Sequence, residues 1–368
     1  MGIQFDILDT EGLARRGLLK TSRGVIHTPA FMPVGTAATV KGLLPSQVEN
    51  IGTDIILGNT YHLMLRPGVE IIDQFGGLNN FMNWEGPILT DSGGFQIMSL
   101  AGLRQIDNDG VTFKSHIDGS LHRLTPEKAI EIQTILGSDI SMVLDECVSF
   151  PADYKTAADA VKRSTIWAKR CKTAYYESPG RGLFGIIQGS IYKDLRMESL
   201  EMLNQFNFDG IAIGGLAVGE GQENMLDILK GISCSLPDLK PHYLMGVGTP
   251  DDIVNAVSLG VDMFDCVLPT RSGRTGRLYT LHGHINIKNS IHSKSEMPID
   301  LDCDCKICNS FSRSYIHHLF RCKEMLGPIV CSIHNLYFYQ NLMKKIRISL
   351  EKNNFKEFHQ IWKKTYKK

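Results

Sequence analysis

The chain has 368 residues, of which 43% are hydrophobic and 21% charged, and its formal net charge at pH 7 is +0. This composition excludes a disordered or fibrous protein, and the length provides for one large α/β domain with an appendage or for two ordinary domains. The N-terminus lacks a basic start and an apolar run, and no stretch approaches the roughly 20 apolar residues of a membrane helix. We therefore expect a soluble, cytoplasmic protein without membrane contact.

Short apolar runs closed by polar residues or glycine recur along the first 270 residues. They are PAFMPVGT (29–36), IILGNT (55–60), PILTDSGG (87–94), SMVLDEC (141–147), LFGIIQG (183–189), GIAIGG (210–215), HYLMGVG (242–248) and MFDCVLPT (263–270). Most lack alternation, which is typical of strands buried on both faces. Helix-compatible stretches separate them, so residues 1–270 are predicted to form a (β/α)8 barrel. A doubly wound sheet should carry a glycine fingerprint after its first strand, and MPVGTAATV is not one.

An insertion is expected between the third and fourth strands. GVTFKSHIDGSLHRL (110–124) contains two alternating runs around an Asp-Gly pair. This pattern predicts a β-hairpin.

The residues that close the strands form an unusual set. Barrel enzymes place catalytic groups at the C-terminal ends of their strands. The residues at these ends are Asp91, Asp145, Gln188, Gly214, Gly215, Gly246 and Asp265. Any single aspartate is as well explained by a turn or a helix cap. Three acids at one barrel mouth are harder to explain by packing, because a buried unpaired acid costs several kcal/mol.

The chemistry of this set matches a purine. Guanine presents N1–H and N2 amino donors and an O6 acceptor, which Asp145, Gln188 and the Gly215 N–H complement. Asp91 and Asp265 then fit a double displacement at an anomeric carbon, one as nucleophile and the other moving protons. This chemistry implies retention at C1′.

The region after the eighth strand, residues 271–335, is expected to be a metal-binding subdomain. An odd total of nine cysteines in an intracellular-looking chain favours metal over disulfides. Cys303, Cys305 and Cys308 are spaced to place three thiolates on one tetrahedral ion, and zinc is the favoured metal. Spacing alone leaves the fourth ligand open; the candidates are His317, His318, Cys322, Cys331 and His334.

Residues 336–368 are expected to form a helical, basic segment that packs back on the barrel. Residues 344–368 include nine Lys or Arg residues and only two Glu residues. A phosphate-backbone contact and an ordinary solvated helix explain this excess equally well.

Eight segments resemble one family. They are LTDSGGFQ (89–96), LDEC (144–147), GIIQG (185–189), IGGLAVGE (213–220), MGVGTPDD (245–252), FDCVLPTRSGR (264–274), CDCKIC (303–308) and SIHNLYFYQ (332–340). In this order they resemble bacterial queuine tRNA-ribosyltransferase, or tRNA-guanine transglycosylase, over nearly the whole chain. The resemblance implies exchange of the wobble guanine, position 34, of GUN-anticodon tRNAs (Asp, Asn, His and Tyr) for preQ1 in queuosine biosynthesis. It also implies a homodimer.

The resemblance assigns roles to residues. Asp265 is similar to the nucleophile that forms a covalent aspartyl-ribosyl intermediate, and Asp91 to the general acid/base. The implied base-binding residues are Asp91, Ser92, Gly93, Gly94, Phe95, Asp145, Gln188, Gly215 and Leu216. Phe95 is placed to stack on the splayed-out base, although an ordinary core phenylalanine is the alternative.

The resemblance also describes the edges of the site. The Leu216 carbonyl, with Glu220 behind it, is similar to the receptor for the preQ1 aminomethyl cation, and Cys147 and Val218 resemble the bacterial form of the pocket. The implied RNA-binding residues are Gly246, Val247, Gly248, Thr249, Pro250, Asp251, Asp252, Thr270, Arg271, Ser272, Gly273 and Arg274. The family match selects His334 as the fourth ligand of one structural zinc per chain. Thr275 stands where other members often have asparagine, which leaves one loop contact open.

Three alternatives remain. A zinc-dependent hydrolase on a barrel needs an open metal site at the strand ends, whereas CDCKIC lies outside the strands. A non-catalytic RNA-binding subunit of the same fold should have lost Asp91 and Asp265. The third alternative is the same chemistry with queuine or guanine as the incoming base. Only the resemblance of Cys147 and Val218 to the bacterial form of the pocket argues against it.

Overall fold

The fold is a closed eight-stranded parallel barrel surrounded by helices, as predicted. The computed structural model describes residues 2–100 and 104–366. The barrel strands are β4 (Ala30–Gly35), β5 (Ile56–Gly58), β6 (Ile88–Thr90), β10 (Ile140–Met142), β11 (Gly182–Ile187), β12 (Gly210–Ile213), β13 (His242–Leu244) and β14 (Met263–Cys266). They pair in this order, and β14 closes the barrel by pairing with β4. Each predicted apolar run overlaps one of these strands.

The barrel strands are shorter than the apolar runs that predicted them. Nearly every strand residue is buried, because the barrel interior covers one face and the helices cover the other. The last residues of each run leave the ladder and form loops at the C-terminal ends of the strands. The predicted site residues lie in or next to these loops.

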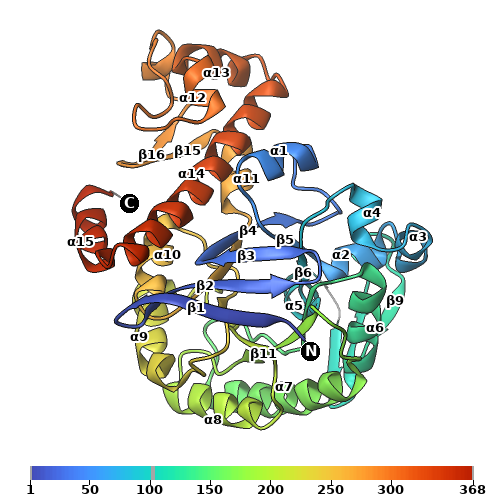
Figure 1. Cartoon of the computed structure of the whole chain (residues 1–368). Coiled ribbons are helices and arrows are strands. Elements are labelled where there is room, and N and C mark those ends of the chain that lie inside the picture. The colour runs from blue at the N-terminus through green and yellow to red at the C-terminus, as the bar shows by residue number, and fades with distance from the viewer. Residues whose placement is uncertain (1, 101–103, 367–368) are drawn as a thin grey trace.

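Helices follow the barrel strands and form a ring around them (Figure 1). They are α1 (Pro45–Asn50), α2 (Thr60–Leu65), α3 (Val69–Gln74), α4 (Leu78–Met82), α5 (Gly94–Leu100), α6 (Pro126–Leu136), α7 (Tyr154–Ala174), α8 (Lys193–Asn204), α9 (Gly221–Ile232), the 3₁₀ turn η1 (Ser233–Ser235), α10 (Pro250–Val257) and α11 (Leu268–Thr275). Side-chain caps fix several starts: Thr125, Asp153 and Thr249 accept hydrogen bonds from the first turns of α6, α7 and α10. Among the described residues no helix is long and apolar enough to cross a membrane.

An antiparallel sheet at the N-terminus was not predicted from the sequence. It comprises β1 (Gln4–Glu11), β2 (Ala14–Thr21) and β3 (Gly24–Thr28). Arg15 on β2 is buried, donates to the carbonyls of Asp238 and Lys240 at 2.7 and 2.9 Å, and pairs with buried Asp262. These residues precede β13 and β14, so the sheet is fastened to the N-terminal end of the barrel, opposite the strand ends that carry the predicted site.

The predicted hairpin is present as β8 (Gly110–Lys114) and β9 (Leu121–Leu124), which pair antiparallel. A third strand, β7 (Arg104–Asp107), pairs with β8 and was not predicted. All four residues of β7 are exposed, so the sequence carries no apolar signal there.

The C-terminal part has its own hydrophobic cluster, which includes Leu278, Ile287, Ile299 and Ile316. Its elements are β15 (Arg277–Thr280), β16 (Gly283–Asn286), the 3₁₀ turn η2 (Ser290–His292), α12 (Lys306–Ser310) and α13 (Arg313–Arg321), followed by α14 (Leu326–Glu351) and α15 (Phe355–Thr365). Figure 1 shows α14 running from this cluster back along the barrel. The proposed subdomain boundary at residues 335 and 336 falls inside α14.

Candidate active site

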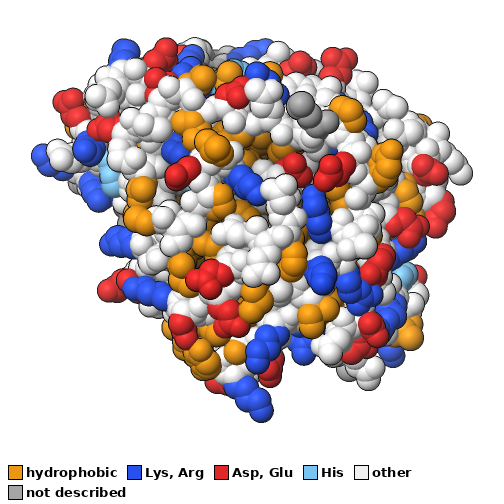
Figure 2. Space-filling view, turned by 60° about the horizontal axis from the view of Figure 1, so that its bottom comes forward, with side chains coloured by type: hydrophobic (Ala, Val, Ile, Leu, Met, Phe, Trp, Pro, Cys, Tyr) orange, Lys and Arg blue, Asp and Glu red, His pale blue; other side chains and the backbone are white. Residues whose placement is uncertain are grey.

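A cavity of about 470 Å³ lies at the C-terminal ends of the barrel strands. Predicted site residues that line it are Asp91, Ser92, Gly93, Phe95, Asp145, Gly215, Leu216, Gly246, Asp265 and Arg271. One face of the molecule has a hollow in which hydrophobic side chains gather, with acidic and basic side chains interspersed around it (Figure 2). This mixture agrees with the formal net charge of +0.

Asp265 lies in β14, and one of its two carboxylate oxygens, Oδ1, accepts two hydrogen bonds. The Tyr243 hydroxyl and the Gly246 N–H both donate to Oδ1, at 2.6 and 2.7 Å. Oδ2 carries neither of these bonds. Removal from water in the pocket raises the pKa of Asp265, and the two hydrogen bonds act in the opposite direction by stabilising the charged form. The two hydrogen bonds fix the carboxylate of Asp265 in the wall of the pocket through Oδ1.

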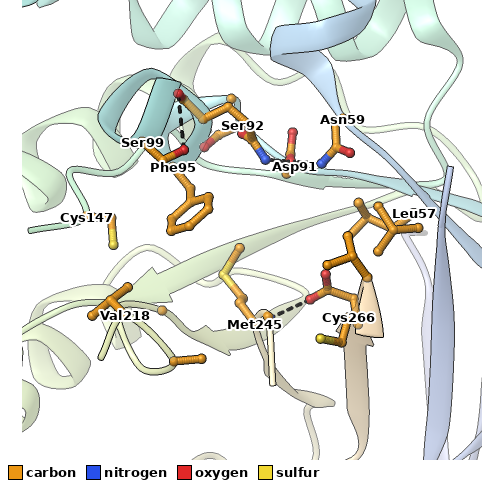
Figure 3. Close-up of a pocket in the computed structure, with 18 of the residues that line it drawn as sticks. Leu57, Asn59, Asp91, Ser92, Phe95, Ser99, Cys147, Val218, Met245 and Cys266 are labelled. Atoms are coloured by element: carbon orange, nitrogen blue, oxygen red, sulfur yellow. Dashed lines mark hydrogen bonds between the residues drawn. The ribbon is translucent and has the colours of Figure 1, made fainter. Parts of the chain in front are cut away.

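Asp91 follows β6 and is held by three donors. Asn59 and Gln96 donate to Oδ2 at 2.5 and 2.7 Å, and the Thr60 N–H donates to Oδ1 at 2.9 Å. Figure 3 shows Asn59 beside Asp91 at the edge of the pocket. Burial raises the pKa of Asp91 to about 6, with a smaller contribution from the charge of Asp265. A carboxyl group with a pKa near neutrality is suited to accept and release protons.

Asp145, which lines the pocket, forms a hydrogen-bonded pair with the buried side chain of Gln188. Gln188 Nε2 donates to Asp145 Oδ2 at 2.6 Å, and Ser92 Oγ donates to Oδ1 at 3.1 Å. Burial raises the pKa of Asp145 to about 6. Gln188 Oε1 is buried without a hydrogen-bond partner among residues 2–100 and 104–366. Such an orphaned polar atom indicates a place where a ligand completes the hydrogen bonding.

The glycine-rich turns near these carboxyls permit close packing. A Cβ on Gly94 would lie 2.5 Å from the Asp145 carbonyl oxygen, so a side chain there would push Asp145 out of place. After β12, Glu220 accepts hydrogen bonds from the N–H groups of Ala217 and Val218 at 2.5 and 2.9 Å. Glu220 therefore fixes the loop that carries Leu216.

Phe95 is 46% exposed, so the alternative of a core phenylalanine does not describe it. It points into the pocket from α5, and Met245 and Val218 lie across from it (Figure 3). Cys147 and Val218 both line the pocket, as the resemblance implies. A flat ring facing an apolar wall provides a slot for a planar ligand.

The two predicted RNA-binding segments lie next to the pocket. Gly246, Thr249 and Arg271 are exposed, and Asp252 and Arg274 are half-buried. The others are buried: Val247, Gly248, Pro250, Asp251, Thr270, Ser272 and Gly273. Arg271 lines the pocket.

The C-terminal part contains a candidate metal centre built from Cys303, Cys305, Cys308 and His334, whose ligand atoms lie within 4.8 Å of one another. The three sulfur atoms are 3.9, 3.5 and 3.4 Å from His334 Nδ1. Tetrahedral zinc, with Zn–S of about 2.3 Å and Zn–N of about 2.0 Å, requires S···N separations of about 3.6 Å, so the residues fit this metal.

The second nitrogen of His334 supports the same assignment. Nε2 lies 2.8 Å from the Tyr279 carbonyl oxygen, which fixes the ring with Nδ1 toward the sulfurs. Of the five candidates that spacing left open for the fourth ligand, the group contains His334, which is the residue that the resemblance selected.

Three residues that hold the site were not identified from the sequence. Asn59 and Tyr243 lie inside quoted strand segments, and Gln96 ends the segment 89–96, yet nothing in those patterns indicates that their side chains reach Asp91 or Asp265. The one available signal is that each lies within two residues of a strand end or a site residue.

A closed parallel barrel with three carboxyl groups in one pocket at its strand ends, and a separate Cys3His cluster, has the architecture of a barrel enzyme. A family model described as queuine tRNA-ribosyltransferase matches residues 9–368. The chain belongs to the queuine tRNA-ribosyltransferase family, and its activity is that of a pentosyltransferase.

Similar proteins cover almost the whole chain. A queuine tRNA-ribosyltransferase of Ruegeria sp. (strain TM1040) is 55% identical over 362 residues, which are 98% of this chain and 95% of the relative. That of Zymomonas mobilis is 55% identical over 366 residues, with coverages of 98% and 95%. That of Thermodesulfovibrio yellowstonii is 53% identical over 361 residues, with coverages of 98% and 94%.

Proposed function

We propose that this enzyme exchanges guanine 34 of tRNAs with GUN anticodons (Asp, Asn, His and Tyr) for preQ1, by double displacement through a covalent aspartyl-ribosyl intermediate in queuosine biosynthesis. The observation that carries the proposal is the division of labour in the pocket. Asp265 has one oxygen anchored and the other without those bonds, Asp91 has a pKa of about 6, and the Asp145–Gln188 pair retains an unpaired acceptor.

The first displacement forms the intermediate. Asp265 Oδ2 attacks C1′ of the wobble nucleoside, the C1′–N9 bond breaks, and protonated Asp91 gives its proton to the leaving guanine, which leaves Asp91 as a carboxylate. In the second displacement Asp91 accepts the N9 proton of preQ1, and N9 attacks C1′ while the ester bond to Asp265 breaks. Two inversions give retention at C1′.

Base selection is proposed to lie in the wall opposite the nucleophile. Asp145 accepts from the N1–H and N2 amino groups, and O6 accepts from the Gly215 N–H and from an amide N–H of Gln188. The Leu216 carbonyl, in the loop fixed by Glu220, accepts from the preQ1 aminomethyl cation. Ser92, Gly93 and Gly94 form the turn beneath the base, and Phe95 stacks on it.

The RNA is proposed to approach along residues 246–252 and 270–274, with Arg271 neutralising a phosphate near the splayed-out nucleotide. We also propose one structural zinc per chain at Cys303, Cys305, Cys308 and His334, because four protein ligands leave no open position for water. A homodimer acting in the cytoplasm completes the proposal, by analogy with the family.

The test is exchange of labelled guanine into unmodified GUN-anticodon tRNA. Wild type should incorporate label, and Asp265→Asn and a tRNA with adenine at position 34 should abolish incorporation. Asp159→Asn, an exposed acid on α7, is the matched control and should retain full exchange. Competition by preQ1 then tests the incoming base against guanine and queuine.

The alternatives give other results. Binding of the tRNA without exchange would favour a non-catalytic subunit, and exchange that persists in Asp265→Asn would refute the assignment of the nucleophile. Release of free guanine with no base incorporated would favour a hydrolase.

A further inference from the structure

The first turn of α8 carries an arginine whose role the proposed reaction does not explain. Arg196 has 0% exposed surface, and its guanidinium donates four hydrogen bonds to described residues, all to backbone carbonyl oxygens. Burial lowers its pKa to about 10, so it stays charged at neutral pH. A buried charge is costly unless it is fully hydrogen-bonded, and packing alone would be served better by an apolar side chain.

The four carbonyls lie at the ends of two neighbouring strands. Ile187 and Ser190, at 3.1 and 2.9 Å, flank Gln188 after β11. Gly214 and Gly215, at 2.6 and 3.3 Å, follow β12. Arg196 therefore links the two strand ends that carry Gln188 and Gly215.

The orientation of one peptide group follows from these contacts. In a trans peptide the C=O and the following N–H point in opposite directions. Arg196 binds the Gly214 carbonyl behind the pocket wall, and Gly215 lines the pocket in front of it. The Gly215 N–H is consequently turned from Arg196 toward the cavity, and the positive charge behind it strengthens the donor.

The turn at Gly215 is packed so closely that it leaves no room for a side chain. A Cβ on Gly215 would lie 3.7 Å from Arg196 Nη2 and 2.4 Å from Gln188 Oε1. Gly215 has a φ of +62°, which a side chain rarely adopts. The wall behind the base is thus a tight stack of Arg196, a glycine turn and Gln188.

We propose that Arg196 is a positioning residue for base recognition: it holds the Gly214–Gly215 peptide so that the Gly215 N–H donates to the exocyclic oxygen of a guanine-class base. The inference rests on the proposed function, because it takes a base with an O6 acceptor as the occupant of the pocket.

The test compares two bases in Arg196→Met and Arg196→Lys. Inhibition constants are measured by competition with labelled-guanine exchange, for guanine and for 2-aminopurine, which has no O6. In the variants the inhibition constant of guanine should rise about tenfold, which is the effect of losing one directed hydrogen bond, and that of 2-aminopurine should rise less than about twofold. Lysine keeps the charge but is too short to hold all four carbonyls, so it should recover part of the guanine affinity.

Arg15→Lys is the matched control. Arg15 is a buried arginine that also binds two carbonyls, at the opposite end of the barrel. It should lower stability and leave the ratio of the two inhibition constants unchanged. If the Arg196 variants bind both bases more weakly by the same factor, or bind neither more weakly, the inference is overturned. If Arg196→Met does not fold, the inhibition constants of Arg196→Lys decide the test. A wild-type enzyme that fails to exchange guanine contradicts the proposed function instead.

Discussion

Removing the Tyr243 hydroxyl tests how the proposed nucleophile is prepared. In Tyr243→Phe, Asp265 loses the 2.6 Å hydrogen bond to Oδ1 and keeps the one from the Gly246 N–H. A hydrogen bond to a charged group contributes about 1.5–3 kcal/mol, and one pKa unit corresponds to about 1.4 kcal/mol. Because the bond favours the carboxylate, its loss should raise the pKa of Asp265 by about one unit or more.

The assay is the pH dependence of kcat/KM for labelled-guanine exchange. The proposed nucleophile must be ionised, so the rate falls as pH drops through its pKa, and in Tyr243→Phe this acid limb should move to higher pH by about one unit. The covalent enzyme–tRNA species trapped on a denaturing gel should decrease most at the acid end. On the alkaline plateau the two enzymes should differ least.

Tyr339→Phe provides the control, because Tyr339 is equally buried and its hydroxyl donates to the Gly248 carbonyl, at 2.5 Å, instead of a carboxylate. It should keep the wild-type pH profile. Superimposable profiles for wild type and Tyr243→Phe would refute the reasoning, as would an equal displacement in Tyr339→Phe.

Three further predictions concern stability and the metal centre. The pKa of Asp91 in the folded state, about 6, lies above its ordinary value of 3.8, so between these values the folded state binds a proton that the unfolded state has lost, and the stability of the wild type falls as pH rises through this window. Asp91→Asn should therefore gain up to about 3 kcal/mol relative to wild type from pH 4 to pH 7 in urea unfolding. A difference in stability that is independent of pH would contradict this prediction. Cys305→Ser should lose bound zinc and unfold at lower temperature while exposed Cys234→Ser retains both, and full metal content by mass spectrometry would rule out the ligand assignment. Gly273→Ala places a Cβ 2.8–2.9 Å from backbone atoms of Cys331 and Ser332 on α14, so it should lower the free energy of unfolding by about 1–3 kcal/mol. It should also weaken tRNA binding more than it weakens inhibition by free guanine. An unchanged free energy of unfolding would show that α11 and α14 separate easily.

The barrel could be predicted because its strands are buried on both faces and therefore appear as apolar runs. Strand β1 of the N-terminal sheet could not, since all its residues are partly exposed or exposed and few are strongly apolar. Strand β7 is fully exposed and has no apolar pattern at all. Elements that contribute little to the core leave little trace in the sequence.

Some residues of the site could be predicted from the sequence and others could not. Asp91, Asp145 and Asp265 are recognisable because acids at strand ends are unexpected. Tyr243 and Arg196 were missed because an apolar-looking tyrosine in a strand and an arginine in a helix are ordinary residues there. Their importance lies in bonds to Asp265 and to the Gly214 carbonyl, across 22 and 18 residues of chain.

Helix α14 has a consequence for the order in which the protein is assembled. Gln340 donates to the Phe31 carbonyl at 3.0 Å and Arg347 to the Pro29 carbonyl at 2.8 Å, so α14 clamps the start of β4, the strand that pairs with β14 to close the barrel. Synthesis proceeds from the N-terminus, so the seven barrel strands from β4 to β13 are made before β14, and α14 is made after it. The nascent chain therefore carries seven barrel strands with an open seam until β14 emerges, and α14 can hold the closed seam only at a later stage.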